Sequence, residues 1–196
     1  TERPQWSADD LLCYYDRDRL AFIVQDTQAR EVTQFPSQTG ISGDWSPDGR
    51  YYLIPEIYLN EVSELTGLES VPSSRLLRFG LDGTRIDLTA SDDVEDASPV
   101  FSTDSEWITF GRKYLDIQRW TPGRQMWIIS TDGEQGRALT DDPLYNHYDF
   151  TWSPNGSQIA YARFNKNVLT EPPEIWMMDT DGFTATRLIS GGSVSY

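Results

Sequence analysis

The chain has 196 residues, with 31 acidic against 16 basic side chains and a formal net charge of −15. That charge argues against nucleic acid or an anionic membrane as the main partner, so a basic or neutral partner is easier to accommodate. The single cysteine, Cys13, excludes an internal disulfide and a thiolate metal cluster. No apolar run reaches the roughly 18 residues of a membrane span, and the start at Thr1 rather than Met suggests a processed or trimmed chain.

Four segments in chain order predict the same strand–turn–strand unit. They are QWSADDLLCYY (5–15), DWSPDGRYYLI (44–54), VFSTDSEWITF (100–110) and TWSPNGSQIAY (151–161), with aromatic anchors at Trp6, Trp45, Phe101 and Trp152. Seven and nine positions after each anchor the residue is apolar or aromatic, a period of two that is typical of strands. The SPDG and SPNG inserts predict tight turns, because proline presets one dihedral and glycine accepts positive φ.

A second strand–turn–strand unit follows each of the first. These units are LAFIVQDTQAREVT (20–33), LLRFGLDGTRIDLT (76–89), MWIISTDGEQGRALT (126–140) and IWMMDTDGFTATRLI (175–189). An Asp-Gly pair marks the turn in the last three, and we align Asp26-Thr27 with that pair in the first. Each complete repeat is then four hairpin-connected antiparallel strands, called A to D. We expect repeats at 4–33, 44–89, 97–140 and 149–190.

Variation in repeat length is confined to one kind of connection. The anchor follows the end of the preceding strand D by 12 residues in every case, as from Thr33 to Trp45, whereas the gaps between strands B and C are 6, 23, 17 and 15 residues. In an up-and-down unit the B–C and D–A connections lie at one end, and the A–B and C–D turns lie at the other. Insertions confined to one face often mark the binding face of a repeat protein.

Four-stranded antiparallel units that recur every 40–50 residues or so are typical of β-propellers. The succession of WSPDG, a hydrophobic strand, IWMMDTDG and a closing Leu-Thr resembles the TolB-like propeller repeat over nearly the whole chain. This resemblance implies an all-β propeller of six or seven blades in a bacterial periplasmic or secreted protein. Four blades are visible, so the chain is a piece of a longer propeller, completes a ring with another copy or chain, or closes as four blades alone.

Residues for catalysis or metal binding are sparse. His147 is the only histidine, and we favour a loop residue packed beside Tyr145 and Tyr148 over a catalytic base or metal ligand. Oligogalacturonate lyases resemble the repeat in fold but use several histidines, and no GxSxG nucleophile motif is present. The sequence therefore assigns no catalytic residue and no cofactor.

Acidic residues cluster at two places in the predicted loops. The clusters are Asp92, Asp93, Glu95 and Asp96, and Asp141 with Asp142. A structural calcium ion could bind such oxygens, but turn and cap chemistry explains them more simply. Asp96 and Asp149 each lie a few residues before an anchor, at a similar register, which suggests a structural acceptor role near the inner strand.

The long B–C inserts supply the candidate binding residues. In EIYLNEVSELTGLESVPSS (56–74), Tyr58, Val62 and Leu65 have helical spacing and Gly67 could end a short helix. RKYLDIQRWTPGR (112–124) combines arginine with aromatic residues, as protein-binding hot spots do. The alternative is that these loops only pack over their own blades. The candidate partner-binding residues are Arg112, Tyr114, Trp120, Tyr148 and Asn165.

These observations favour a non-enzymatic module that binds a protein or peptide through its B–C/D–A end. Two alternatives remain at this stage. The chain could be the gating propeller of a prolyl-oligopeptidase-like peptidase whose catalytic domain lies outside this sequence, or a sensor or scaffold domain attached to a membrane protein.

Overall fold

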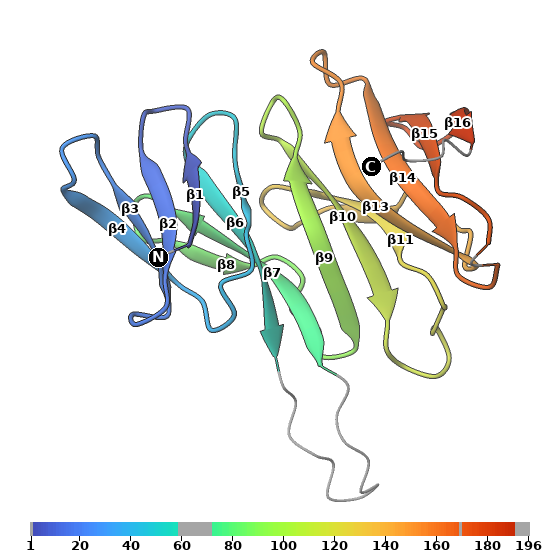
Figure 1. The fold of residues 1–196 in the computed structure, drawn as a ribbon, viewed down its shortest axis with the longest axis horizontal. Helices are drawn as coiled ribbons and strands as arrows, with labels where there is room; N and C mark the ends of the chain where they lie inside the picture. Colours follow the sequence, from blue (N-terminus) through green and yellow to red (C-terminus); the bar gives the residue numbers. More distant parts are fainter. Residues whose placement is uncertain (1, 59–71, 169, 191–196) are drawn as a thin grey trace, which may run out of the picture. The chain divides into compact units, whose positions relative to one another are not determined.

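The structure, a computed structural model, describes residues 2–58, 72–168 and 170–190 (Figure 1). In this part of the chain there are sixteen β-strands and no helix. The described residues therefore contain no helix that could span a membrane. The chain divides into two compact units, Thr1–Pro99 and Val100–Tyr196, which are considered separately.

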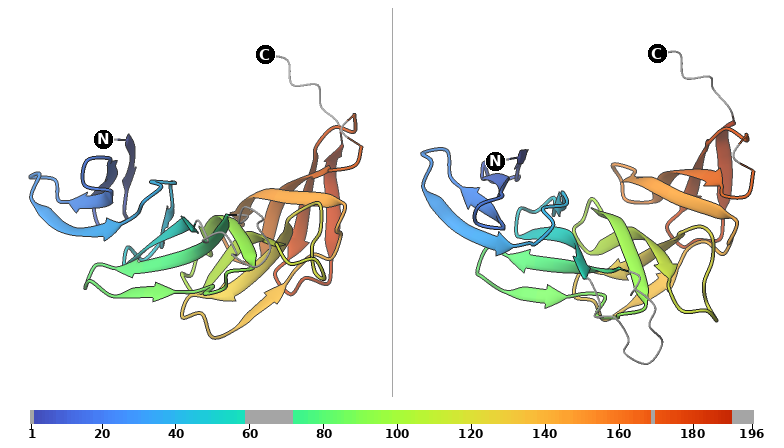
Figure 2. Two further views of the ribbon diagram at one scale, coloured as in Figure 1. Left: turned by 90° about the horizontal axis from the view of Figure 1, so that it is seen from below. Right: turned by 60° about the horizontal axis from the view of Figure 1, so that its bottom comes forward.

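The first unit contains two sets of four antiparallel strands that pair in sequence order, and the second set belongs to a larger sheet. The first set is formed by β1 (Glu2–Trp6), β2 (Leu12–Asp16), β3 (Ala21–Gln25) and β4 (Glu31–Pro36). The second is formed by β5 (Asp44–Trp45), β6 (Tyr51–Tyr58), β7 (Ser73–Gly80) and β8 (Arg85–Asp87). Figure 2 shows them as separate layers, blue for β1–β4 and cyan to green for β5–β8.

The second unit repeats this arrangement. One set of paired strands is β10 (Trp107–Tyr114), β11 (Gln125–Ser130) and β12 (Gly136–Ala138). The other is β13 (Tyr145–Trp152), β14 (Gln158–Asn165), β15 (Glu174–Asp179) and β16 (Ala185–Ser190). The remaining strand, β9 (Val94–Phe101), carries the chain from one unit to the other. The predicted all-β fold of four-stranded antiparallel units is confirmed.

The A–B turn of every repeat places a residue with positive φ four positions after the anchor. These residues are Asp10 (57°), Gly49 (74°), Ser105 (64°) and Gly156 (70°). A serine at the start of each turn accepts a hydrogen bond from the first strand-B residues, as Ser46 Oγ does from Tyr51 N at 2.9 Å. The same local chemistry therefore closes the turn even where SADD or STDS replaces the glycine-containing sequence.

The C–D turn corrects one alignment made from the sequence. Ala29 has φ of 61° and occupies the place of Gly83, Gly133 and Gly182. Gln28-Ala29, not Asp26-Thr27, therefore corresponds to the Asp-Gly pair. Asp26 lies at the first position of the turn, where its carboxylate accepts hydrogen bonds from the backbone N–H groups of residues 28 and 30.

Each unit has its own hydrophobic core between its sheets. In the first unit, Phe35 of β4 stacks on Tyr52 of β6 with ring centroids 5.9 Å apart, and Trp45 lies 6.4 Å from Phe35. In the second unit, Trp152 of β13 belongs to one buried cluster with Met126 of β11. Trp45 and Trp152 thus each pack against the preceding repeat of their own unit, as stacked propeller blades require.

Strand A is irregular just before the anchor. Arg3, Ser98 and Asp149 all have positive φ, three residues before their anchors, and the β13–β14 register shifts between Tyr148 and Thr151. The expected match of Asp96 with Asp149 is therefore wrong. Asp96 corresponds to His147, five residues before the anchor, and both are buried whereas Asp149 is exposed.

The expected helix in the second B–C insert is only partly testable. Tyr58 is the last residue of β6 and so belongs to a strand. Val62, Leu65 and Gly67 lie outside the described residues.

Candidate partner-binding face

The 112–124 segment of the second unit begins at the end of β10 and ends just before β11. It contains four basic residues and one acidic residue, in a chain whose overall charge is strongly negative. Cations and aromatic rings in and beside it form what we call the cation–aromatic surface. Its members are Arg112, Lys113, Tyr114, Arg119, Trp120 and Trp127.

Two groups of cations and rings make up this surface, one around Arg112 and Tyr114 and the other around Lys113, whose side chain leaves the opposite face of β10. The guanidinium of Arg112 lies 4.8 Å from the ring of Trp127, and the ring of Tyr114 lies 6.2 Å from the same indole. Arg119 lies 4.1 Å from the ring of Tyr114. The second group pairs Lys113, whose Nζ is 5.0 Å from the indole centroid, with Trp120. Each contact orients a cation beside the face of a ring.

The tip of the segment is exposed. Trp120 is 54% exposed and Ile117 is 98% exposed. Arg119 Nε forms an ion pair with Asp116 at 2.7 Å. The Asp116 carboxylate also accepts hydrogen bonds from the backbone N–H groups of residues 118 and 119, and these contacts fix the tip. Large apolar side chains are thus presented to solvent on a locally ordered loop.

The C-terminal end of the segment is fastened to the beginning of β13. Gly123 N donates to Pro143 O at 3.1 Å, and Arg124 N donates to Asn146 Oδ1 at 3.2 Å. A Cβ at Gly123 would lie 2.0 Å from Tyr145 O, so the two backbones touch where only glycine fits. The B–C loop of the third repeat and the D–A connection of the fourth therefore form one surface.

His147 lies beneath this junction, within β13 rather than in a loop as the sequence suggested. It is 1% exposed, its Nδ1 is 2.8 Å from Arg124 O, and its ring packs on Tyr161 at 5.6 Å. Its Nε2 is buried without a hydrogen-bond partner. Burial lowers the pKa of His147 against the opposing effect of the Arg124 carbonyl, so the ring is held neutral.

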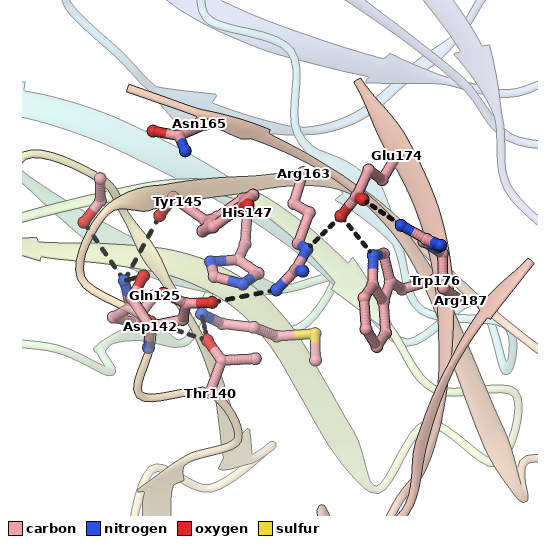
Figure 3. A network of polar contacts seen from close by, with 12 residues as sticks. Gln125, Thr140, Asp142, Tyr145, His147, Arg163, Asn165, Glu174, Trp176 and Arg187 are labelled. Atoms are coloured by element: carbon pink, nitrogen blue, oxygen red, sulfur yellow. Dashed lines mark hydrogen bonds and ion pairs between the residues drawn. The ribbon is translucent and has the colours of Figure 1, made fainter. Parts of the chain in front are cut away.

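Beside His147, Arg163 of β14 is the centre of a polar network (Figure 3). Its Nε donates to Glu174 Oε2 at 2.9 Å and its Nη1 donates to Asp142 Oδ2 at 3.0 Å. The guanidinium also lies 4.0 Å from the ring of Tyr145 and 4.1 Å from that of Trp176. Only 15% of the Arg163 side chain is exposed. Its two ion pairs join β14 to β15 through Glu174 and to the D–A connection through Asp142.

Glu174 is shared among several donors. Trp176 Nε1 donates to its Oε2 at 2.8 Å, and Arg187 Nη1 donates to its Oε1 at 3.0 Å. Burial alone would raise the pKa of Glu174, but the hydrogen bonds from Trp176, Arg187 and Arg163 outweigh it and hold the pKa below its usual value. The carboxylate is therefore a fixed structural acceptor.

Gln125 ties the D–A connection to β11. Its amide exchanges two hydrogen bonds with the backbone of Asp142, at 2.8 and 2.9 Å, and accepts one from Thr140 Oγ1 at 3.1 Å. Thr140 in turn accepts from Met126 N. The threonine that follows strand D makes the same contact in the second repeat, where Thr89 Oγ1 accepts a hydrogen bond from Leu76 N of strand C.

The five residues expected to form the binding face fall into two groups. Arg112, Tyr114 and Trp120 belong to the cation–aromatic surface. Tyr148 and Asn165 lie on the β13–β14 pair, where Tyr148 packs on Phe164 at 5.6 Å. Burial and then the nearby Asp149 raise the pKa of Tyr148. Asn165 caps the following loop by accepting from Val168 N and donating to Glu171.

Sequence reasoning missed the Arg163 network. The sequence feature that could have revealed it is the opposite charge of Arg163 and Glu174, which face each other across β14 and β15. The acidic clusters are at least partly engaged in ion pairs: Asp142 with Arg163, and Asp92 with Arg75. No group of three or more metal-ligating side chains occurs among the residues that the structure describes. A structural calcium ion remains only a prediction.

No known family model matches the chain, and no curated protein does either. Several solved structures are similar to it. An oligogalacturonate lyase in complex with manganese has a TM-score of 0.71 at 20% identity, covering 98% of this chain and 54% of the lyase. TolB from Acinetobacter baumannii has a TM-score of 0.60 at 16% identity, covering 96% and 43%. Porphyromonas gingivalis dipeptidyl peptidase 4 has a TM-score of 0.64 at 12% identity, covering 97% and 33%.

These similarities establish the fold. The chain has a TolB-like propeller fold, and it spans about half the length of the lyases it matches. At identities of 20% or below, the shared architecture carries no assignment of activity.

Proposed function

We propose that this chain is a non-enzymatic TolB-like propeller module that binds a protein or peptide through the B–C/D–A end of its third and fourth repeats. The observation that carries the proposal is the cation–aromatic surface. Trp120 is more than half exposed there, and Lys113 is stacked on its ring.

The chemistry of the surface fits recognition of another polypeptide. Tryptophan, tyrosine and arginine are the residues that contribute most to protein–protein binding when they are held in place. The 112–124 segment is held at Gly123 and Arg124 by the start of β13. A loop ordered before binding loses less conformational entropy when a partner docks.

Local charge indicates the partner's chemistry. The 112–124 segment carries four cations and one acid although the chain as a whole carries −15. We propose that the partner segment is acidic and contains an apolar side chain that packs on Trp120. The distant negative charges are screened over about 8–10 Å at physiological ionic strength, whereas the contacting cations are not. This partner differs from the basic or neutral one that net charge alone favoured.

The resemblance of the repeats to the TolB-like family also suggests where the module works. We propose a bacterial, extracytoplasmic location, periplasmic or secreted, as the WSPDG-type repeats imply. The partner would then be an extracytoplasmic protein or the exposed segment of one.

Fluorescence anisotropy of a short synthetic peptide tests the binding proposal. The peptide alternates Asp or Glu with Leu, and its matched control replaces every acid by the corresponding amide. We expect the acidic peptide to bind at least about tenfold more tightly than the control, with an affinity that falls as salt rises.

Two variants locate the binding. Trp120→Ala should weaken it by about tenfold or more. Phe183→Ala removes an exposed aromatic side chain from the C–D turn at the opposite end of the repeat and should leave the affinity unchanged. Equal binding of the acidic and amide peptides, or equal loss in both variants, would contradict the proposal.

A second candidate function is a gating propeller for a peptidase. It is favoured by the similarity to Porphyromonas gingivalis dipeptidyl peptidase 4 and to a prolyl endopeptidase, with TM-scores of 0.64 and 0.65. A native reading frame that also encodes an α/β-hydrolase domain would support it over the binding module. A sensor or scaffold domain in a membrane protein is distinguished in the same way, by a membrane anchor in that frame.

The lyase similarity does not lead to a proposal of lyase activity. The family resemblance implies several histidines in those enzymes, whereas this chain contains only His147. Its ring is buried, with Nδ1 at the Arg124 carbonyl oxygen.

A further inference from the structure

A cleft of about 370 Å³ lies between the third and fourth repeats, within the second unit. It is at the end of the repeats that carries the A–B and C–D turns, opposite the cation–aromatic surface. The side chains in its wall come from both repeats. They include Asp104, Trp107 and Arg137 of the third and Trp152, Thr180 and Asp181 of the fourth.

Hydrogen bonds between the two repeats hold the rim of this cleft. Arg137 Nη2 of β12 donates to Thr180 O at 2.8 Å, which joins strand D of one repeat to the C–D turn of the next. Thr180 N donates to Ser157 O at 3.1 Å. Within the described residues Arg137 forms no ion pair, so its charge is available to the oxygen atoms of a ligand.

Each repeat also brings one carboxylate to the cleft from a turn. Asp104 Oδ1 accepts hydrogen bonds from Ser102 Oγ and Glu106 N. Asp181 Oδ1 accepts one from Phe183 N at 2.9 Å. In the part of the chain that the structure describes, Oδ2 of each aspartate has no hydrogen-bond partner. The turns therefore fix both carboxylates and leave one oxygen atom of each to accept a hydrogen bond from a ligand.

Trp107 gives the cleft an aromatic wall. This first residue of β10 packs against the buried cluster of the second unit and is itself only partly buried. Among the described residues no cation and no second ring stacks on it, so part of its indole is open to the cleft. Trp152 is more deeply buried, at 9% exposure. An open indole offers a large, rigid apolar surface against which a flat ligand can pack.

The cleft between the first and second repeats is built on the same turn positions. Those positions are Asp9, Gly49 and Asp82 in that cleft and Asp104, Gly156 and Asp181 in the other. The first cleft is smaller, about 260 Å³, and its aromatic side chain, Tyr51, is already covered. Arg78 lies 4.2 Å and Arg50 lies 5.3 Å from the centre of the Tyr51 ring. The paired aspartates thus recur, whereas the open ring distinguishes the cleft beside Trp107.

We infer that the cleft between the third and fourth repeats binds a neutral sugar ring. An anion that paired with Arg137 would be opposed by two carboxylates, and a cation that paired with the aspartates would be opposed by Arg137. Hydroxyl groups both donate and accept, so a neutral sugar bonds to both kinds of group without burying a charge of its own. The apolar C–H face of the sugar packs on Trp107.

The size of the cleft agrees with such a ligand. Its volume of about 370 Å³ falls in the range of roughly 300–1,000 Å³ that is typical of small-molecule sites. The cleft is at the opposite end of the repeats from Trp120, so the inference does not depend on the proposed binding of an acidic peptide.

Saturation-transfer NMR on the full 196-residue chain tests the inference. The probes are the methyl glycosides of glucose, galactose and mannose. At least one of them should receive saturation on its ring C–H protons. For the sugar that binds best, the matched uronate carries an anion and the matched amino sugar carries a cation on the same ring. We expect the neutral glycoside to bind about tenfold more tightly than either charged form.

Three variants locate the site. Trp107→Ala should weaken binding by about tenfold, with circular dichroism to check that the chain stays folded. Asp181→Asn keeps an oxygen atom for Phe183 N but removes a charge, so it should reduce the preference for the neutral glycoside over the uronate. Trp120→Ala, at the other end of the repeat, should leave sugar binding unchanged.

Several results would overturn the inference. One is the absence of saturation transfer to every neutral glycoside, and another is a charged form that binds as tightly as its neutral parent. Binding that is unaffected by both Trp107→Ala and Asp181→Asn would place the sugar elsewhere on the chain and would overturn it equally.

Discussion

The Nδ1 atom of His147 lies 2.8 Å from the carbonyl oxygen of Arg124, joining β13 to the residue that precedes β11. The opposite ring nitrogen is buried without a partner. Protonation would place a charge where there is neither solvent nor an acceptor. Burial therefore favours the neutral ring, although the Arg124 carbonyl oxygen by itself would favour the protonated one, and the contact supports the attachment of the 112–124 segment.

The first prediction follows from this buried imidazole. Folding lowers the pKa of His147 below its ordinary value of 6.5. As pH falls from about 7 to 5, the unfolded chain takes up a proton before the folded chain does, so the free energy of unfolding decreases. His147 is the only histidine, and the lowered carboxyl pKa values act only at more acidic pH. Urea unfolding at a series of pH values measures this slope.

The matched variant is His147→Gln, which keeps a donor for the Arg124 carbonyl oxygen but does not titrate. Its stability should vary much less over the same pH range. Parallel slopes for the two proteins would show that some other group is responsible.

The second prediction concerns Arg163. Arg163→Ala leaves Glu174 and Asp142 without their shared cation and removes the stacking with Tyr145 and Trp176. Breaking such a largely buried pair typically costs about 3 kcal/mol. Arg163→Lys should recover only part of this, because an ammonium cannot form the planar two-carboxylate contact. Urea unfolding midpoints compare the variants.

Arg187→Ala is the control for that experiment. Arg187 also pairs with Glu174, but its side chain is 53% exposed. An exposed pair contributes about 0.5 kcal/mol. A loss for Arg187→Ala equal to that for Arg163→Ala would contradict the central place given to Arg163.

The third prediction compares two glycines that are needed for different reasons: Gly123 because another backbone lies close to it, and Gly83 because its φ is positive. Gly123→Ala would place a Cβ 2.0 Å from Tyr145 O, so the loop must lift from β13. We expect faster amide exchange in 112–124 and weaker binding of the acidic peptide. Gly83→Ala meets no atom within 4 Å and costs only the strain of positive φ, about 1 kcal/mol. Unchanged exchange in Gly123→Ala would argue against the fastening.

Ala29→Gly gives the fourth prediction, a gain in stability. Ala29 has a φ of 61° where the other three repeats have glycine. Relief of this strain should raise the free energy of unfolding by about 0.5–1 kcal/mol. Part of this gain is offset because glycine also increases the conformational entropy of the unfolded chain. The reverse change, Gly133→Ala, should lower it, and a loss in Ala29→Gly would contradict the turn assignment.

The all-β fold was predictable because its signals are local and repeated. Alternating apolar residues after Trp45 and Trp152, and the turns that follow them, specify strands and hairpins within a few residues. Sequence patterns also assigned Arg112, Tyr114 and Trp120 to a single variable loop, but Arg112 and Tyr114 belong to the end of β10 and only Trp120 lies in the loop. These features depend on neighbours in the chain, which a sequence shows directly.

What could not be predicted depends on register and on contacts between repeats. Ser98 and Asp149 share the positive-φ position three residues before their anchors, whereas Asp96 and His147 lie five residues before theirs and are both buried. Arg163 lies in an ordinary strand, and only the packing of Asp142 and Glu174 around it reveals its role.

Hydrogen–deuterium exchange of the chain with and without the acidic peptide tests the assigned binding face most directly. We predict slower exchange in residues 112–124 and 142–148 when the peptide is bound, and no change in the A–B and C–D turns. Protection confined to those turns, such as 46–49 and 180–183, would contradict the assignment of the B–C/D–A end as the binding face.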